Sequence, residues 1–402
     1  MSYTRQDMKN VQDCFSQKAS VGREERSSTP EKIAAAVEAV VEAVFQYEVI
    51  KIAIDMHDKL WVMSRQLDNA TPQPPQNFSP EKALEFIAKQ VKLARRVVCC
   101  YEAGCFGYGP QRRIAAMGAE CLVIAPQDWD ERKKKVRTDK SDTLAMVQRL
   151  DRYVAGNRKA LAVVRVPSLE EEVRRSRVRE RQQLLGDRNR WANIGKSLLM
   201  EYGLPASWSW WKPGRWEQVR KNVKDGMGEH AEALLKMLED YREVLTAVSE
   251  KLHALTVEQQ KKQKERQARA RMVRLRGIGE LSMAVIESEI IDWHRFSNRR
   301  QVASYTGLCP GVSGTGGQFT GLSVNKCGNR RLRSMLVELA WLLPRYQPGY
   351  VPLQRWKAVL SAGHRSGKKK AIVALARCLA VDLWRIHTGR TTPEKLGLKL
   401  AA

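Results

Sequence analysis

Four acidic residues stand out by their positions in the chain. Asp55 ends the isoleucine- and valine-rich segment EVIKIAID, and Glu102 ends a second such segment, RVVCCYE. Asp139 and Asp142 lie in KKKVRTDKSDTLAM, at an expected helix start, where positions i and i+3 face the same side. Acids at the ends of neighbouring strands project to one edge of a sheet, where four carboxylates would repel each other without divalent cations between them. Paired hard cations with oxygen ligands commonly assist displacement at phosphorus.

Each acid on its own also has a simpler interpretation. Asp139 would serve as a helix N-cap, and Asp55 as a turn residue at the end of a strand. Four acids at corresponding points in a chain of net charge +26 favour a common site over four unrelated turns and caps.

Two short hydroxyls, Ser313 and Thr315, lie in the glycine-rich stretch LCPGVSGTGGQFTG, residues 308–321. This stretch has no charged residue, although 28% of the chain is charged, and the basic segment NKCGNRRLR follows it. The stretch is either a surface turn or a loop that presents a nucleophilic hydroxyl to a phosphate backbone, with glycines removing steric bulk.

The composition indicates a globular protein with a polyanionic partner. The chain has 402 residues, 43% of them hydrophobic, which is enough for two or three domains. The net charge of +26 makes nucleic acid the first candidate partner. Long apolar runs and a secretory leader are missing from the sequence, so we expect a cytoplasmic, nucleoid-associated protein with no membrane partner. The eight cysteines and six histidines show no zinc-ligand spacing.

Basic tracts flank both candidate sites. Such runs are often only solvated surface, but their position beside the acids and the hydroxyls favours contacts with phosphates. The residues expected to bind nucleic acid are Lys133, Lys134, Lys135, Lys326, Asn329, Arg330, Arg331 and Arg333.

The positioning elements are predicted from hydrophobic periodicity. Strands alternating with helices over residues 47–160 predict an α/β domain with a mixed sheet, after an N-terminal extension with a helix at 1–46. The proline-rich segment 71–80 is expected to be a loop. Residues 161–272 predict two long helices in a coiled-coil hairpin, joined by a tryptophan-rich connector. Residues 273–402 predict a helical C-terminal domain that carries the hydroxyl loop.

Two apolar patterns in the helical region favour packing over recognition. Trp208, Trp210, Trp211 and Trp216 could stack on RNA bases, but such a cluster more often packs under a long loop. The leucines between Leu234 and Leu255 are most simply a helix-pairing face.

The order of the motifs resembles a known enzyme family. IAIDMHDK, CYEAGCFGYGPQRRIAAMGAECLVIAP and KVRTDKSDTLA, followed by RLRGIGELSMAVIESEI, FSNRRQVASYTGLCPG and NKCGNRRLRSMLVELAW, are similar to the DEDD transposases with an RNase H-like (RuvC-like) domain. These are the bridge-RNA-guided insertion-sequence recombinases, related to Piv-type DNA invertases. The resemblance covers roughly residues 48–390.

The resemblance implies a mechanism and partners. It makes Asp55, Glu102, Asp139 and Asp142 a metal-binding tetrad for Mg²⁺ or Mn²⁺. It implies a hydroxyl nucleophile that forms a covalent protein–DNA intermediate. It further implies a structured guide RNA that pairs with donor and target DNA, and a dimer or tetramer assembled through the coiled coil.

The sequence departs from the family pattern at the nucleophile. The position five residues after Pro310, where relatives place serine, is Thr315, and Ser313 lies two residues too early. We expect Thr315 to attack, with Ser313 or an inactive copy as the alternatives. Two other functions remain open: a Holliday-junction-type nuclease that uses the acids without a covalent intermediate, and a non-catalytic nucleic-acid scaffold.

Overall fold

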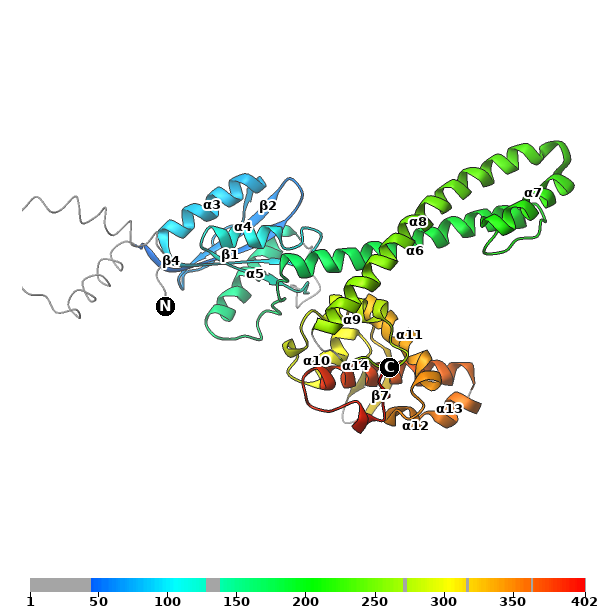
Figure 1. Cartoon of the computed structure of the whole chain (residues 1–402). Helices are drawn as coiled ribbons and strands as arrows, with labels where there is room; N and C mark the ends of the chain where they lie inside the picture. Colours follow the sequence, from blue (N-terminus) through cyan, green and yellow to red (C-terminus); the bar gives the residue numbers. More distant parts are fainter. Residues whose placement is uncertain (1–44, 128–137, 270–272, 316–317, 363, 402) are drawn as a thin grey trace, which may run out of the picture. The chain divides into compact units, whose positions relative to one another are not determined.

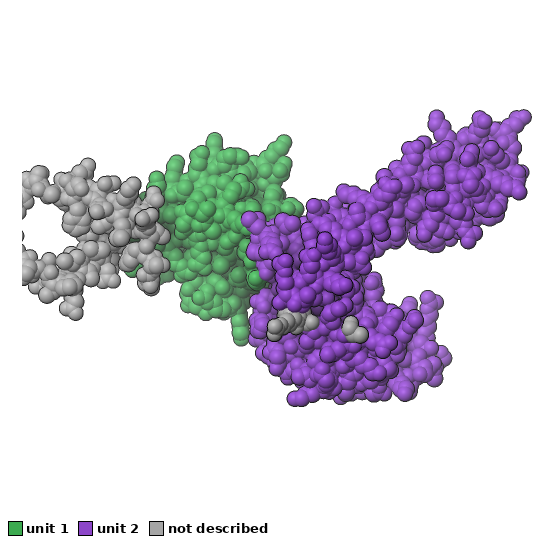
Figure 2. Space-filling model, in the orientation of Figure 1, with its two compact units in different colours: residues 1–166 green, residues 167–402 purple. Residues whose placement is uncertain are grey.

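The computed structural model describes residues 45–127, 138–269, 273–315, 318–362 and 364–401. Its internal contacts divide the chain into two compact units, Met1–Val166 and Pro167–Ala402, which Figure 2 distinguishes by colour. The helix expected within residues 1–46 lies outside the described residues, apart from positions 45 and 46.

Unit 1 contains a mixed five-stranded sheet with the strand order β3-β2-β1-β4-β5. β1 runs parallel to β4, and β4 parallel to β5, whereas β2 is antiparallel to both β1 and β3. The α/β prediction with a mixed sheet is therefore confirmed. The strands are β1 (Tyr47–Met56), β2 (Trp61–Leu67), β3 (Gln76–Phe78), β4 (Ala94–Glu102) and β5 (Glu120–Ile124).

The proline-rich segment 71–80 is not entirely a loop, because it contains β3, which pairs with β2. A strand of three residues is too short to show an alternating pattern in sequence, so only its pairing identifies it.

Helices cover both faces of this sheet (Figure 1). They are α3 (Pro80–Leu93), α4 (Gly109–Ala116) and α5 (Asp139–Val154). Because successive strand residues point to opposite faces, Ile52 and Ile54 of β1 pack with Ile87 of α3 and Ile114 of α4.

The opposite face of the sheet belongs to α5. Ala53 of β1 and Val98 of β4 form a second core there with Met146 and Leu150. This helix packs mainly against β1 and β2 and also touches β4; Asp55 is the penultimate residue of β1, and Glu102 is the last residue of β4.

Unit 2 begins with an arm of long helices. They are α6 (Leu169–Glu201), α7 (Pro213–Met227) and α8 (Ala231–Arg269), with the short 3₁₀ helix η1 (Gly228–His230) before α8. α6 and α8 are in contact and lie side by side in Figure 1. Leu234, Leu238 and Leu245 of α8 are buried in one core with Leu199 of α6, which confirms the predicted helix-pairing face.

Tryptophans from the connector fill the core of this arm. Trp210 and Trp216 are buried, and the Trp210 ring nitrogen donates a 2.9 Å hydrogen bond to the carbonyl of Ala192. The packing interpretation is confirmed for these two residues, whereas Trp208 is 52% exposed.

The remainder of unit 2 is a group of helices around one hydrophobic core. The helices are α9 (Glu280–Ile290), α10 (Arg299–Thr306), α11 (Arg330–Tyr346), α12 (Val351–Gln354), α13 (Lys357–Ala362) and α14 (Arg365–His387), with the 3₁₀ helices η2 (Trp293–Arg295) and η3 (Glu394–Leu396). Within the described ranges, no helix is both long enough and apolar enough to cross a membrane.

The stretch at 308–321 differs from the expected loop. It forms β6 (Pro310–Thr315) and most of β7 (Gln318–Val324), which pair antiparallel with a register shift between Pro310 and Val312. Glycine lowers strand propensity, but its backbone still makes full ladder hydrogen bonds, so composition alone hid this hairpin.

Candidate active site

The register of the sheet brings Asp55 and Glu102 together. β1 and β4 are parallel with Ile54 opposite Tyr101, so one further step sets Asp55 beside Glu102 at the same edge. Ala53 and Cys100, two residues earlier on these strands, pack against α5. Both acids therefore lie on the α5 side of the sheet.

The N-terminus of α5 is capped by Thr138 and not by Asp139. The Ser141 N–H donates to the Thr138 hydroxyl at 3.2 Å, and the Thr138 N–H donates to the Ser141 hydroxyl at 3.1 Å. The capping interpretation of Asp139 is thus wrong, and its carboxylate is available to a site. Asp55 lies inside β1, so its interpretation as a turn residue is wrong as well.

A buried lysine anchors the other end of α5 to the sheet. Lys51, on the same face of β1 as Asp55, forms an ion pair with Asp151 and donates a 2.7 Å hydrogen bond to the Asp68 carbonyl. The Lys51 side chain is almost fully buried. A buried ammonium is strongly destabilising without an opposite charge and hydrogen bonds, so the ion pair with Asp151 is needed to keep it there. Lys51 and Thr138 together determine where Asp139 and Asp142 lie above the strand ends.

His57 joins the acids. Its Nε2 lies 3.2 Å from Oδ2 of Asp139 and 3.9 Å from Oδ2 of Asp55. The ligand atoms of Asp55, His57 and Asp139 all lie within 4.8 Å of one another, so this group could hold a metal ion. His57 was not predicted, because the spacing among histidines and cysteines does not reveal it. The available signal was Asp-x-His at a strand end, where residues i and i+2 share a side.

The negative charges around Asp55 favour the binding of a cation. Burial raises the pKa of the Asp55 carboxyl, the negative charges of Asp139 and Asp142 raise it further, and His57 opposes them. Asp142 therefore acts on the site although it is not part of the three-residue group. Glu102 accepts a hydrogen bond from the Gln127 N–H at 3.3 Å. A divalent cation would remove the repulsion between these carboxylates.

The two candidate nucleophiles lie on the β6–β7 hairpin of unit 2. Ser313 is exposed and pairs with Thr320, whereas Thr315 ends β6 and pairs with Gln318. Gly316 and Gly317, which join the strands, are outside the described residues.

The start of α11, which follows the hairpin in the chain, is bound to a buried carboxylate. Asn329 caps α11 by accepting from the Leu332 N–H at 3.0 Å, and its amide donates to Glu289 of α9 at 2.7 Å. Arg179 of α6 donates two hydrogen bonds to Glu289, each of 3.0 Å. Although burial opposes it, the bonds from Arg179 and Asn329 hold the pKa of Glu289 below its usual value. Glu289 was not predicted.

The expected nucleic-acid-binding residues divide into three groups. Asn329 is engaged as described, and Arg333 donates to the carbonyls of Lys326 and Thr306 at 2.9 and 3.3 Å. Lys326, Arg330 and Arg331 are exposed. Lys133, Lys134 and Lys135 lie outside the described residues.

Comparisons with known proteins place the chain in a family. The sequence profile of the transposase IS116/IS110/IS902 family matches residues 270–351, which include α9 and the hairpin. The chain is also 35% identical over 311 residues to the Sinorhizobium fredii protein named "Putative transposase y4rJ", covering 71% of this chain and 75% of the relative. The chain belongs to the IS116/IS110/IS902 transposase family.

Other relatives of this transposase family agree. "Putative transposase y4qE" of Sinorhizobium fredii is 30% identical over 321 residues, covering 72% of this chain and 75% of the relative. "Transposase for insertion sequence element IS1111A" of Coxiella burnetii is 25% identical over 330 residues, covering 77% and 83%. The resemblance to a family of insertion-sequence transposases, inferred from the motifs, is confirmed.

Proposed function

We propose that this transposase-family chain cuts and rejoins the DNA of a mobile element by metal-assisted displacement at phosphorus. The observation that carries the proposal is the convergence of Asp55, His57 and Asp139 at one sheet edge, with Glu102 beside them and Asp142 acting on the same carboxyl. The strand order and the position of α5 support an RNase H-like (RuvC-like) fold for unit 1.

The acids would hold Mg²⁺ or Mn²⁺. Carboxylate oxygens suit both ions, and an imidazole ligand such as His57 is more readily accepted by Mn²⁺ than by Mg²⁺. When bound, such cations polarise the phosphoryl oxygen and stabilise the charge on the attacking and leaving oxygens. Asp55, Glu102, Asp139 and Asp142 would supply the ligand oxygens, and the cap at Thr138 would fix two of them.

The hydroxyl of Thr315, or alternatively of Ser313, would be the nucleophile. Its oxygen forms a bond to phosphorus while the bond from phosphorus to one bridging DNA oxygen breaks. The hydroxyl proton leaves to solvent, and the leaving oxygen takes up a proton. Attack by a DNA hydroxyl on the protein-bound phosphate then rejoins DNA and restores the side chain, so no external energy source is needed.

Nucleic-acid partners complete the proposal. The net charge of +26 and the exposed Lys326, Arg330 and Arg331 support binding of donor and target DNA and of a structured guide RNA. The paired helices α6 and α8 support a coiled coil through which a dimer or tetramer would form.

The nucleophile is tested by trapping the covalent protein–DNA adduct. We expect Thr315→Ala to abolish the adduct, Thr315→Ser to retain it, and Ser313→Ala to leave it largely intact. Loss of the adduct in Ser313→Ala alone would transfer the role to Ser313. The junction nuclease would be favoured instead if both alanine variants kept metal-dependent cleavage and neither the wild type nor any variant formed an adduct.

The metal site is tested with Asp142→Asn and the matched control Asp58→Asn, an exposed aspartate just after β1. We expect Asp142→Asn to abolish Mn²⁺-dependent cleavage and to reduce the increase in Tm that Mn²⁺ causes, while the control retains both. Normal cleavage by Asp142→Asn would exclude this site, and an unchanged response of every variant to metal would favour the non-catalytic scaffold.

A further inference from the structure

A hollow of about 780 Å³ lies between α10, α12 and α14 of unit 2. Its volume falls within the range typical of ligand pockets, about 300–1,000 Å³. Six cationic side chains and a single carboxylate line it. The cationic residues are Arg299, Arg300, Arg355, Arg377, Arg385 and Lys395.

The single carboxylate is already neutralised within the protein. Asp382 accepts a 2.7 Å hydrogen bond from the Tyr350 hydroxyl and a 3.3 Å bond from Arg385. Of the six cations, only Arg385 forms an ion pair with a residue that the structure describes. The other five positive charges around the hollow therefore have no carboxylate within 4.0 Å among the described residues.

Two of these positive charges lie at the positive end of a helix dipole, which is unfavourable. Arg299 and Arg300 are the first two residues of α10, whose first turn contains no acid. The N-terminus of a helix is the positive end of its dipole, so cations there are unfavourable unless an anion approaches. An anionic ligand in the hollow would remove this repulsion.

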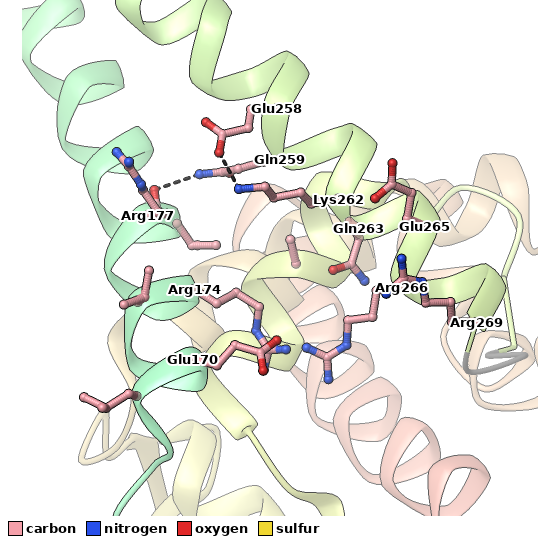
Figure 3. Close-up of a pocket in the computed structure, with 14 residues that line it drawn as sticks. Glu170, Arg174, Arg177, Glu258, Gln259, Lys262, Gln263, Glu265, Arg266 and Arg269 are labelled. Atoms are coloured by element: carbon pink, nitrogen blue, oxygen red, sulfur yellow. Dashed lines mark hydrogen bonds and ion pairs between the residues drawn. The ribbon is translucent and has the colours of Figure 1, made fainter.

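The charge balance differs from that of another hollow in the same unit, of about 850 Å³. The pocket between α6 and α8 contains Arg174, Arg177, Lys262, Arg266 and Arg269, but also Glu170, Glu258 and Glu265 (Figure 3). Lys262 and Glu258 form a 2.6 Å ion pair there, drawn as a dashed line in Figure 3. Its cations are balanced largely within the protein, whereas those of the hollow at α10 and α14 are not.

Apolar groups determine which kind of anion fits. Val351, Pro352, Trp356 and Leu396 also line the hollow. A free phosphate would leave these groups unused, whereas a nucleotide chain offers phosphates to the arginines and sugars and bases to the apolar wall. Cys309 belongs to the lining and directly precedes Pro310, where β6 begins. The hollow is thus adjacent to the base of the hydroxyl hairpin.

We propose that this hollow binds the backbone phosphates of a nucleic-acid strand beside the hydroxyl hairpin. The inference rests on the proposed function, because it gives that reaction a binding site next to its nucleophile. The hollow holds the strand electrostatically and does not take part in the chemistry. Arg300 of α10 and Arg355, just after α12, line the hollow from separate elements, and their guanidinium groups would bind the phosphates.

The test measures binding without chemistry, in EDTA, by fluorescence anisotropy of a labelled single-stranded DNA, the same RNA sequence and a DNA duplex. The double variant Arg300→Gln/Arg355→Gln removes two exposed charges from the hollow. The control Arg215→Gln/Arg220→Gln removes two exposed charges from α7. Each phosphate that the variant no longer neutralises should reduce the slope of log K against log salt concentration by about 0.7 for a single strand and about 0.9 for a duplex.

We expect the hollow variant to lose about tenfold in affinity at moderate salt and about 1.4 in slope on single strands, while the control stays near the wild type. Arg300→Lys/Arg355→Lys should retain the slope, and Lys395→Gln alone should lose about half as much as the double variant. Loss on DNA only, on RNA only or on both identifies the strand. Equal slopes for the hollow variant and the control on all three ligands would overturn the proposal. Because EDTA prevents metal-assisted cleavage, this result is independent of the adduct assay.

Discussion

Asp139 is free to bind a ligand because its neighbour, Thr138, caps the helix in its place. The side chain of Thr138 accepts from the Ser141 amide in the first turn of α5, so the carboxylate next to it is not needed as a cap. The same carboxylate instead lies 3.2 Å from His57 and raises the pKa of Asp55. At this scale the site is an electrostatic arrangement of like charges that is unfavourable by itself and favourable around a cation.

His387 gives a residue-scale prediction with a defined pH window. Its ring stacks on Trp293 with centroids 4.9 Å apart, and burial lowers its pKa from 6.5 to about 4. Between these values the unfolded chain binds a proton that the folded chain does not, so stability falls as the pH falls through this window. We expect about 2 kcal/mol of unfolding free energy to be lost from pH 7 to 4.5 through this residue.

The measurement is the pH dependence of the unit 2 unfolding transition in urea. His387→Phe keeps a stacked ring without the titration, so its stability should fall less over the same pH range. Identical pH profiles for the variant and the wild type would contradict the assignment.

At the scale of elements, the pairing of α6 with the tryptophan connector depends on a missing side chain. A Cβ built on Gly195 of α6 would lie 2.0 Å from the Trp210 ring, whereas one on Gly186 of the same helix would meet nothing within 4 Å. We expect Gly195→Ala to destabilise the arm by several kcal/mol through overpacking. Gly186→Ala should stabilise it by about 0.5–1 kcal/mol through helix propensity.

Thermal unfolding followed by circular dichroism measures this pair. Because both changes add the same methyl group to one helix, opposite signs would identify the contact with Trp210 as the cause. Similar Tm values for the two variants would contradict the packing described here.

Glu289 connects three elements and gives a second prediction at this scale. It is buried on α9 and binds Arg179 of α6 and Asn329, the cap of α11. Glu289→Gln leaves the half-buried Arg179 without its counter-charge, and loss of such charge-assisted hydrogen bonds costs about 1.5–3 kcal/mol. Glu280 is on the same helix as Glu289, is more exposed, and forms an ion pair with Arg274. Glu280→Gln should therefore cost only about 0–1 kcal/mol. Urea unfolding compares the two, and equal losses would show that Glu289 is not a structural tie.

At the scale of the whole molecule, the hydrophobic cores divide as the two units do. The two cores around the sheet contain only residues of unit 1, and the cores of the helical arm and of the C-terminal helices contain only residues of unit 2. We therefore expect two calorimetric transitions. Mn²⁺ should raise the Tm of one of them, and Gly195→Ala should lower the Tm of the other. A single transition that shifts with both changes would mean that the units unfold as one.

The sequence determined the elements of unit 1 because their hydrophobic periods are local. The isoleucines of β1 and the alternation of strands with helices over residues 47–160 required no knowledge of distant contacts. The same local patterns indicated the leucine face of α8 and placed the acids at strand ends and at a helix start. Segments dominated by glycine or proline were the exceptions, since the strands β3, β6 and β7 exist through backbone pairing that side-chain patterns do not record.

Only the tertiary structure decided which of these residues meet. Asp55 and Asp139 are separated by 84 positions, and His57 joins them because a strand end and a helix start are placed together by Lys51 and the core under α5. Glu289 and Arg179 are 110 residues apart, and the basic hollow takes its lining from α10, α12, α14 and η3. Sequence patterns record what each residue needs over a few neighbours, whereas a site depends on sheet register and helix packing, which are set by contacts between distant segments.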